Sequence, residues 1–270
     1  MFRAIVFDLD DTLLRDDLTI SDETVRVLHA FHDRGIRIIP ASGRAPASML
    51  DFARRIGCCD LLIASNGAEI ATPEGSILSQ VMIADVVAQR ILAFGNESGI
   101  YMHTYLADSF HYNRDSVWSD RYRISARLTG VRETDLPAFV RAHPTNKILM
   151  MAHRDTISAL YPKACALFSR EASVTTSKAE FLEFNPGGTS KGKALHEALR
   201  RLSIMPEETM VFGDGINDLS MLLPPFYGVA MKNAAPAVQE QAKDVCGDNA
   251  SDGVARYLLS HETLFAEVHA

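Results

Sequence analysis

The sequence predicts an α/β protein: a parallel sheet with helices on both faces, interrupted by a smaller α+β domain. Two observations predict this. Near both ends of the chain, short segments that are apolar throughout alternate with amphipathic helical segments, which is typical of strands buried between two layers of helices. In the middle of the chain, apolar and polar residues alternate within the strands, which indicates an antiparallel sheet with one less buried face.

The amino-terminal part supplies the first three strands of the pattern. The apolar run Ala4–Phe7 forms the first strand. A helix should begin at Ser21, whose hydroxyl suits an N-cap, and end at Gly35. A second strand follows at 36–41, a helix at 47–56 and a third buried strand at 61–64. This order is that of a doubly wound, Rossmann-like sheet with right-handed crossovers.

The same alternation returns near the carboxyl end of the chain. Helices are expected there at 191–202, 218–223 and 235–242, and strands at 209–212 and 227–231. We therefore assign residues 1–82 and 185–270 to one α/β core domain.

Residues 83–184 have a different pattern. Ile100–Leu106 and Phe110–Asn113 predict an antiparallel hairpin, because their polar and apolar residues alternate around a tight connection. The other elements expected in this segment are helices at 84–98, 135–142 and 155–170 and strands at 146–152 and 173–184. We predict that residues 83–184 form an α+β domain inserted into the core.

Composition excludes several classes of function. The chain has 27 Lys and Arg residues against 34 Asp and Glu residues, a net charge of −7, which argues against general binding of nucleic acid or of an anionic membrane. No apolar run approaches the roughly 18 residues of a membrane-spanning helix, and the first residues do not resemble a signal peptide. The four cysteines have no metal-binding spacing. We expect a soluble, cytoplasmic protein with reduced thiols.

Polar residues follow several of the predicted strands. Asp8, Ser42 and Asp214 each end an apolar segment, and Asn66 is a weaker candidate of the same kind. In open α/β sheets, ligands bind beyond the carboxyl ends of the strands, so these side chains should converge although they are far apart in sequence. Each residue alone could simply favour a turn. As a set, they predict a binding site.

The densest acidic cluster is Asp8-Leu9-Asp10-Asp11-Thr12. As the chain leaves the strand, Asp8 could bind a hard cation through its side chain and Asp10 through its backbone carbonyl. Asp214, flanked by glycines that allow a sharp turn, offers a third ligand. Oxygen ligands of this kind suit Mg²⁺. Without a metal, several carboxylates at one place would repel one another and raise one another's pKa values.

Lys191 stands at the start of a predicted helix. A lysine in the first turn is unfavourable for the helix dipole, which favours a functional role. Its ammonium group could neutralise phosphate charge. The alternative is a solvated surface lysine.

Four motifs occur in a fixed order along nearly the whole chain. They are Asp8-Leu9-Asp10-Asp11-Thr12-Leu13, Ala41-Ser42-Gly43-Arg44, Ser190-Lys191-Gly192-Lys193 and Gly213-Asp214-Gly215-Ile216-Asn217-Asp218. Together they resemble the haloacid dehalogenase superfamily, specifically its Cof-type phosphatases, which carry a large αβ cap between the second and third motifs. One departure is Asp11, where many members have Gly.

The resemblance implies a chemical role for each carboxylate. Asp8 would be the nucleophile that forms an aspartyl-phosphate. Asp10 would protonate the leaving alkoxide and then activate water, so it should be protonated more often than Asp8 in the substrate complex. Mg²⁺ would be bound by Asp8, the carbonyl of Asp10 and Asp214.

The resemblance also implies which residues hold the phosphate. The Ser42 hydroxyl, the Gly43 amide and Lys191 would bind the phosphoryl oxygens. Asn217 and Asp218 would orient metal waters, Lys191 or the phosphate. Arg44 would either reach the substrate or anchor its loop, and the loop role is favoured. The substrate would be a small phosphorylated metabolite such as a sugar phosphate.

Two other functions use the same motifs. A phosphotransferase or phosphomutase would pass the phosphoryl group to a sugar hydroxyl instead of to water. A non-enzymatic aspartyl-phosphate sensor would also combine an Asp with Mg²⁺, Lys and Ser. Asp10 argues against the sensor, because an acid that assists hydrolysis would shorten the life of the signal.

The strand at 100–106 places Tyr101, His103 and Tyr105 on one face. This face could contact a leaving group, but an ordinary solvent-exposed face is the favoured interpretation. Lys147 and Glu183, on separate strands, are expected to pair with each other rather than with a substrate.

Overall fold

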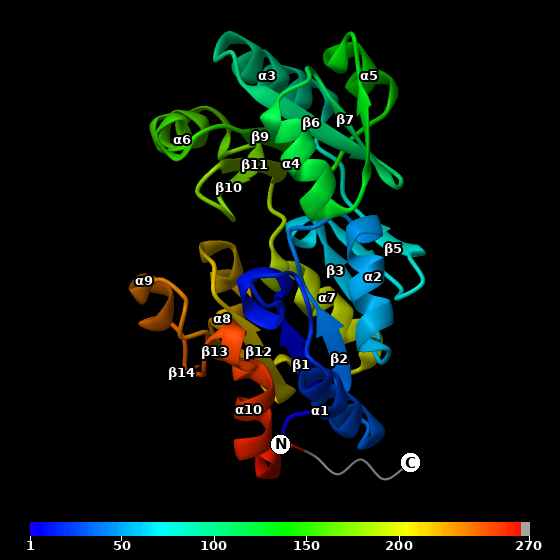
Figure 1. The fold of residues 1–270 in the computed structure, drawn as a ribbon, viewed down its shortest axis with the longest axis vertical. Coiled ribbons are helices and arrows are strands. Elements are labelled where there is room, and N and C mark those ends of the chain that lie inside the picture. The colour runs from blue at the N-terminus through cyan, green and yellow to red at the C-terminus, as the bar shows by residue number, and fades with distance from the viewer. Residues whose placement is uncertain (266–270) are drawn as a thin grey trace. The chain divides into compact units, whose positions relative to one another are not determined.

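In the computed structural model, residues 1–265 are described, and the chain divides into two compact units (Figure 1). The core unit consists of Met1–Leu78 and of the chain from Ser190 onward. The inserted unit consists of Ser79–Thr189. The α/β fold class that the sequence predicts is confirmed for the core unit by its parallel sheet.

The sheet of the core unit has five parallel strands in the order β14-β13-β12-β1-β2. Their bounds are β1 (Ala4–Phe7), β2 (Arg37–Pro40), β12 (Thr209–Gly213), β13 (Tyr227–Ala230) and β14 (Asp244–Val245). Every residue of β1 and β12 is buried, because these central strands are covered on both faces. The strand order places β1 between β2 and β12. The connection from β1 to β2 therefore runs toward one edge of the sheet, and the connections from β12 to β13 and β14 run toward the other edge.

Helices cover both faces of this sheet. They are α1 (Asp22–Asp33), α2 (Pro46–Ile56), α7 (Lys191–Leu202), α8 (Leu219–Leu222), α9 (Pro236–Gln239) and α10 (Gly253–Ser260). As predicted, Ser21 caps α1 by accepting a hydrogen bond from the amide of Thr24 at 3.0 Å. Helix α1 packs against α10, and α7 packs against α8. Helix α1 connects β1 to β2, and α8 connects β12 to β13 in the opposite direction along the sheet. Because both crossovers are expected to be right-handed, the two helix pairs lie on opposite faces.

The third predicted strand does not join the parallel sheet, which is a correction. Strand β3 (Leu62–Ala64) pairs antiparallel with β4 (Glu69–Ala71), and β5 (Ile77–Gln80) completes a separate sheet of order β3-β4-β5. The cause is a tight turn at 65–67, in which three consecutive residues have positive φ angles. A single parallel bridge, Ala41↔Ile63, still links β3 to the end of β2.

The inserted unit contains a six-stranded sheet of order β10-β11-β9-β6-β7-β8. The strands are β6 (Tyr101–Leu106), β7 (Ser109–Tyr112), β8 (Thr129–Arg132), β9 (Ile148–Met151), β10 (Ala172–Thr175) and β11 (Phe181–Pro186). The single strand predicted at 173–184 is thus two antiparallel strands, β10 and β11. Strand β8 was missed, because its sequence has little apolar character.

Three helices of the inserted unit, α3 (Asp85–Glu97), α5 (Leu136–Ala142) and α6 (Arg154–Phe168), contribute to an apolar cluster with one face of this sheet. A fourth helix, α4 (Val117–Ala126), was not predicted, because most of its residues are polar or exposed. Its start is fixed by a capping box between Ser116 and Ser119.

The other face of this sheet, which carries Tyr101, His103 and Tyr105, is covered by protein. The interpretation of this face as solvent-exposed, which the sequence favours, is therefore wrong. His103 is fully buried and Tyr101 is 1% exposed. The cause is α4, whose Tyr122 ring lies 4.1 Å from the His103 ring. The predicted pairing of Lys147 with Glu183 is confirmed by a buried ion pair of 2.6 Å.

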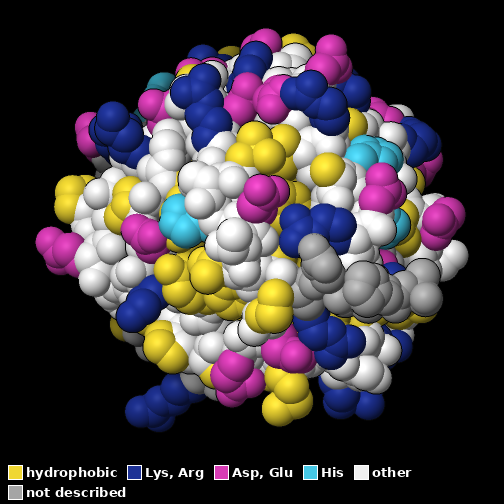
Figure 2. Space-filling view, turned by 90° about the horizontal axis from the view of Figure 1, so that it is seen from below, with side chains coloured by type: hydrophobic (Ala, Val, Ile, Leu, Met, Phe, Trp, Pro, Cys, Tyr) yellow, Lys and Arg dark blue, Asp and Glu magenta, His cyan; other side chains and the backbone are white. Residues whose placement is uncertain are grey.

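The surface drawn in Figure 2 carries Lys, Arg, Asp and Glu side chains interspersed with one another and with apolar side chains. Among the residues that the structure describes, no helix combines the length and the apolar character needed to cross a membrane.

Candidate active site

The predicted site residues of the core unit meet at one edge of the parallel sheet. Asp8 follows β1, Ser42 follows β2 and Asp214 follows β12, and these three strands are neighbours that run in the same direction. This is the switch point at which ligands bind in open α/β sheets. The convergence that the sequence predicts is therefore present.

The loop after β1 turns sharply beyond its first acid. The amide of Asp8 still extends the sheet by donating to Phe212 O at 3.0 Å. Asp10 then has extended backbone angles, and Asp11 has a φ of 57°, inside the left-handed region. The Thr12 hydroxyl donates to Asp214 Oδ1 at 2.6 Å and ties this loop to the end of β12. Sequence reasoning gave Thr12 no role, because a threonine in a turn carries no distinctive signal.

Asp8, Asp214 and Asp218 form a cluster in which one carboxylate oxygen of each lies within 4.8 Å of the others. Burial raises the pKa of Asp8 well above its ordinary value, and the neighbouring carboxylates add to this effect against the attraction of Lys191. Burial, followed by repulsion from Asp218, raises the pKa of Asp214 to about 7. An all-oxygen donor set of carboxylates that repel one another fits a hard divalent cation.

Lys191 lies beside this cluster and is fully buried. Its ammonium is 2.6 Å from Asp218 Oδ1 and 2.8 Å from Asp8 Oδ1. Burial lowers the pKa of Lys191, but attraction to Asp218 and Asp8 outweighs this effect and raises the pKa above its ordinary value. The residue is therefore a buried cation, and the alternative of a solvated surface lysine is wrong.

Asp218 is occupied by contacts within the protein. Besides Lys191, it accepts hydrogen bonds on Oδ2 from the amides of Asp214 and Gly215 at 3.0 and 2.9 Å. It therefore holds both the lysine and the backbone of the loop that carries Asp214.

Asp10 does not belong to the carboxylate cluster. Both of its oxygens accept hydrogen bonds from the Arg44 guanidinium, at 2.8 Å from Nε and 2.9 Å from Nη2. Arg44 is nearly buried, so this side chain is directed to a carboxylate of the protein. The geometry favours the loop-side role that was expected of Arg44.

The remaining predicted residues surround the same edge. The Ser42 hydroxyl oxygen accepts from the Arg44 amide at 3.2 Å. Asn217 donates to Asn66 Oδ1 at 3.2 Å. A side chain at Gly43 would lie 3.0 Å from the same Asn66 oxygen, so glycine keeps this approach open. Asn66 was only a weak candidate, yet the left-handed turn after β3 brings it into this group.

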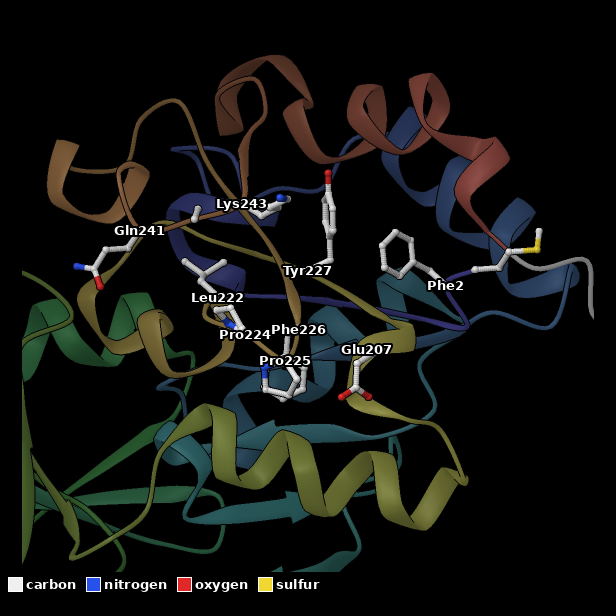
Figure 3. A pocket seen from close by; sticks show the side chains of 11 residues that line it. Phe2, Glu207, Leu222, Pro224, Pro225, Phe226, Tyr227, Gln241 and Lys243 are labelled. Carbon is white, nitrogen blue, oxygen red and sulfur yellow. The ribbon is translucent and has the colours of Figure 1, made fainter.

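A groove of the core unit lies away from these residues and holds about 600 Å³ (Figure 3). It is lined by Phe2, Tyr227 and the Pro224-Pro225 turn, among others. Phe2 precedes β1 and Tyr227 begins β13, so this groove lies at the amino ends of the strands. The carboxylates lie at the opposite ends, and the groove is therefore separate from the candidate active site.

Together, the fold and the site define a Rossmann-like α/β protein whose acids and buried lysine meet at the switch point of a parallel sheet. Residues 5–258 match the family described as haloacid dehalogenase-like hydrolase. The chain belongs to this family, as a Cof-type member, and the resemblance seen in the motifs is confirmed.

Relatives and solved structures agree with this assignment. The chain is 30% identical over 268 residues to an HMP-PP phosphatase of Cronobacter sakazakii, covering 96% of this chain and 95% of that one. A crystal structure of a Thermotoga maritima protein has a TM-score of 0.83 and 30% identity, covering 96% and 97%. A phosphatase of the same superfamily from Bacteroides thetaiotaomicron has a TM-score of 0.83 and 25% identity, covering 98% and 96%. The enzyme class that these similarities support is phosphoric monoester hydrolase.

Proposed function

We propose that this chain is a Mg²⁺-dependent phosphatase that hydrolyses small organic phosphomonoesters through an aspartyl-phosphate on Asp8. The observation that carries the proposal is the position of the Asp8 carboxylate. It lies at the end of β1, in contact with the buried ammonium of Lys191 and in one cluster with Asp214.

In the first step, a carboxylate oxygen of Asp8 attacks phosphorus and the ester P–O bond breaks. The leaving alkoxide takes a proton from Asp10. In the second step, Asp10 takes a proton from water, and the water oxygen attacks the phosphorus of the aspartyl-phosphate. The bond between phosphorus and Asp8 then breaks, which releases inorganic phosphate and restores the Asp8 carboxylate and the protonated carboxyl of Asp10.

Other side chains bind and orient the phosphoryl group. The Ser42 hydroxyl, the Gly43 amide, Lys191 and the Asn217 amide are the donors at this edge of the sheet, and phosphoryl transfer depends mostly on such positioning and charge neutralisation. Arg44 positions the Asp10 carboxylate through two hydrogen bonds. This contact suits Asp10 as the base of the second step, and to act as the acid of the first step Asp10 must take up a proton against the charge of Arg44.

Asp8, Asp214 and the backbone carbonyl of Asp10 would hold Mg²⁺. When bound, the cation would offset the negative charge shared by these carboxylates and the phosphate. Asp218 would support the metal site indirectly, because its own oxygens are engaged by Lys191 and by two backbone amides.

The substrate class is a small phosphorylated metabolite. The names of the relatives and the family resemblance each suggest candidate substrates within this class. Relatives are named HMP-PP phosphatase, so HMP-PP is the first candidate. Sugar phosphates, the class expected from the family resemblance, form the second group.

The test is a phosphate-release assay over HMP-PP, a panel of sugar phosphates and a simple aryl phosphate, with Mg²⁺ and with a chelator. We expect release only with Mg²⁺, and loss of release in Asp8→Asn. Asp17→Asn serves as the matched control, because Asp17 is an exposed acid in the same amino-terminal loop region and lies outside the cluster. Isomerised sugar phosphate without free phosphate would indicate a phosphomutase. Activity retained by Asp8→Asn would refute the mechanism.

A further inference from the structure

The loop that carries Asp8 and Asp10 has an irregular backbone that needs support. Asp10 has extended angles, with φ −65° and ψ 131°, inside a segment that otherwise turns. Asp11 follows with φ 57° and ψ 7°. Left-handed angles are easily adopted by glycine but are disfavoured for residues with a side chain, although Asp tolerates them better than most. The loop therefore depends on contacts from outside.

Asn233 supplies one of these contacts. It lies after β13, more than two hundred residues along the chain, and its Nδ2 donates to the carbonyl of Asp11 at 2.7 Å. Its Oδ1 accepts from the backbone amide of Asn249 at 3.2 Å. Because the oxygen is directed to that amide, the NH₂ group must face Asp11. The orientation of the Asn233 amide is thus determined by its two partners.

Asn249 holds the other end of the loop. This buried side chain donates to the carbonyl of Leu14 at 3.0 Å and to Asp16 Oδ1 at 3.1 Å. Asn233 and Asn249, here called the asparagine pair, are linked to each other and bind the backbone of the loop at Asp11 and Leu14. They connect two carboxyl-terminal segments to the loop that carries the reacting carboxylates.

We propose that Asn233 is a positioning residue for the reaction: by fixing the carbonyl of Asp11, it sets the direction in which Asp10 presents its carboxylate. This inference rests on the proposed phosphatase function. Asn233 acts through the backbone and contacts neither Asp8 nor Asp10 in the hydrogen bonds of the described residues. Catalytic groups must be held closely, since a displacement of about 1 Å can cost 10²-fold in rate.

The first measurement is the kinetics of phosphate release from a simple aryl phosphate with saturating Mg²⁺. In Asn233→Ala we expect kcat to fall roughly ten- to a hundredfold while KM stays within about twofold. Asn233→Asp keeps an oxygen that accepts from the amide of Asn249. It replaces the NH₂ group that donates to Asp11 with a second oxygen, which repels the Asp11 carbonyl oxygen. We expect its loss of kcat to be at least as large.

The second measurement tests rescue through the backbone. Asp11→Gly removes the steric cost of the left-handed angle, so the loop should depend less on Asn233. We expect Asn233→Ala to lower kcat by a smaller factor in the Asp11→Gly background than in the wild-type background. A merely structural role of Asn233 would give equal factors.

The third measurement is hydrogen–deuterium exchange of the loop. The amides of Leu13 and Leu14 donate to Asp8 O and Leu9 O within the loop. They should exchange faster in Asn233→Ala. The matched control is Asn113→Ala in the inserted unit, because the Asn113 amide also joins a carbonyl, Ile100 O, to an amide, Met102 N. That variant should change neither the exchange of the loop nor kcat.

The outcomes separate the two proposals. A wild-type chain that releases no phosphate from any ester refutes the proposed function. A wild-type chain that is active, with kcat of Asn233→Ala within twofold of it or with equal losses in both Asp11 backgrounds, refutes the positioning role alone.

Discussion

The Arg44 guanidinium binds both carboxylate oxygens of Asp10, although the two residues are 34 positions apart. Its Nη1 also donates to Ser48 at 3.1 Å, and its guanidinium carbon lies 5.0 Å from the centre of the Phe52 ring. Helix α2 thus contacts the arginine through two side chains that lie one turn apart on the same helix face. The direction of the Asp10 carboxylate is therefore coupled to the start of a helix that carries none of the reacting groups.

Replacement of Arg44 by lysine tests this coupling. Lysine keeps the positive charge but cannot bind a carboxylate through two parallel hydrogen bonds. We expect Arg44→Lys to lower kcat roughly ten- to a hundredfold with little change in KM, because Asp10 loses its orientation. Arg54→Lys is the control, since Arg54 is exposed on the same helix and pairs with Asp51. Equal kinetics in both variants would contradict the positioning of Asp10 by Arg44.

A second prediction concerns the covalent intermediate. In Asp10→Asn, neither protonation of the leaving group nor activation of water is assisted, and we expect kcat to fall by about 10²–10⁴. With an aryl phosphate, whose leaving group needs little protonation, the second step should be slowed more than the first. The aspartyl-phosphate should then accumulate on Asp8 and be detected by mass spectrometry of the peptide that contains it.

Asp8→Asn is the control for this experiment, because it lacks the attacking oxygen. Phosphoryl transfer to another residue of Asp10→Asn, or undiminished turnover by that variant, would contradict the assignment of the two carboxylates.

Most of the fold could be predicted from local sequence patterns. The helix expected at 191–202 is Lys191–Leu202 in the structure, because its amphipathic period and its Ser190 cap are local signals. The separate sheet β3-β4-β5 could not be predicted. It depends on a turn in which Ser65 and Asn66 adopt positive φ angles, and neither residue type requires them.

The sequence predicts which residues gather at the site, because the ends of the strands place them there. Because parallel neighbours end at one edge, the meeting of Asp8, Ser42 and Asp214 follows from their positions in sequence. The partners of their side chains could not be predicted. The contact of Asn233 with Asp11 links segments that only the folded chain brings together. The catalytic roles of these residues and the limits of the inserted domain stay predictions.

A third prediction follows from the raised pKa of Asp214. Unfolded, this carboxyl titrates near 3.8, whereas in the metal-free folded state its pKa is about 7. Between these values the unfolded chain has released a proton that the folded chain keeps, so the free energy of unfolding falls as pH rises. The loss is complete above about pH 7. Asp8, whose pKa is also raised, contributes with the same sign.

Mg²⁺ should reverse this loss, because it binds the ionised carboxylates. We expect the cation to raise the melting temperature by several degrees near pH 8 and by less near pH 5.5, as measured by differential scanning fluorimetry. Asp214→Asn should weaken both the pH dependence and the effect of Mg²⁺. An equal effect of Mg²⁺ at both pH values would contradict the assignment of Asp214 as a ligand.

A fourth prediction concerns His103 in the inserted unit. Burial, and then the charge of Lys147, lowers the pKa of His103 well below its ordinary value of 6.5. The folded protein therefore keeps this imidazole neutral, whereas the unfolded chain binds a proton as pH falls below about 6.5. The contribution of His103 to stability is fully present above that pH and is lost as the solution becomes acidic. Its Nδ1 has no hydrogen-bond partner in the described residues, so protonation gains nothing there.

His103→Phe tests this sign. Phenylalanine keeps the ring contacts with Tyr122 and Phe110 but cannot take up a proton. It loses the hydrogen bond to Tyr105 at a cost of about 1 kcal/mol, partly offset because the unsatisfied Nδ1 is removed as well.

The free energy of unfolding in urea should therefore be similar for wild type and His103→Phe near pH 8, whereas near pH 5.5 the variant should lose less stability than wild type. His143→Phe, at an exposed position of the same unit, should keep the wild-type dependence on pH. Parallel pH profiles of wild type and His103→Phe would show that the buried imidazole does not cause the loss in acid.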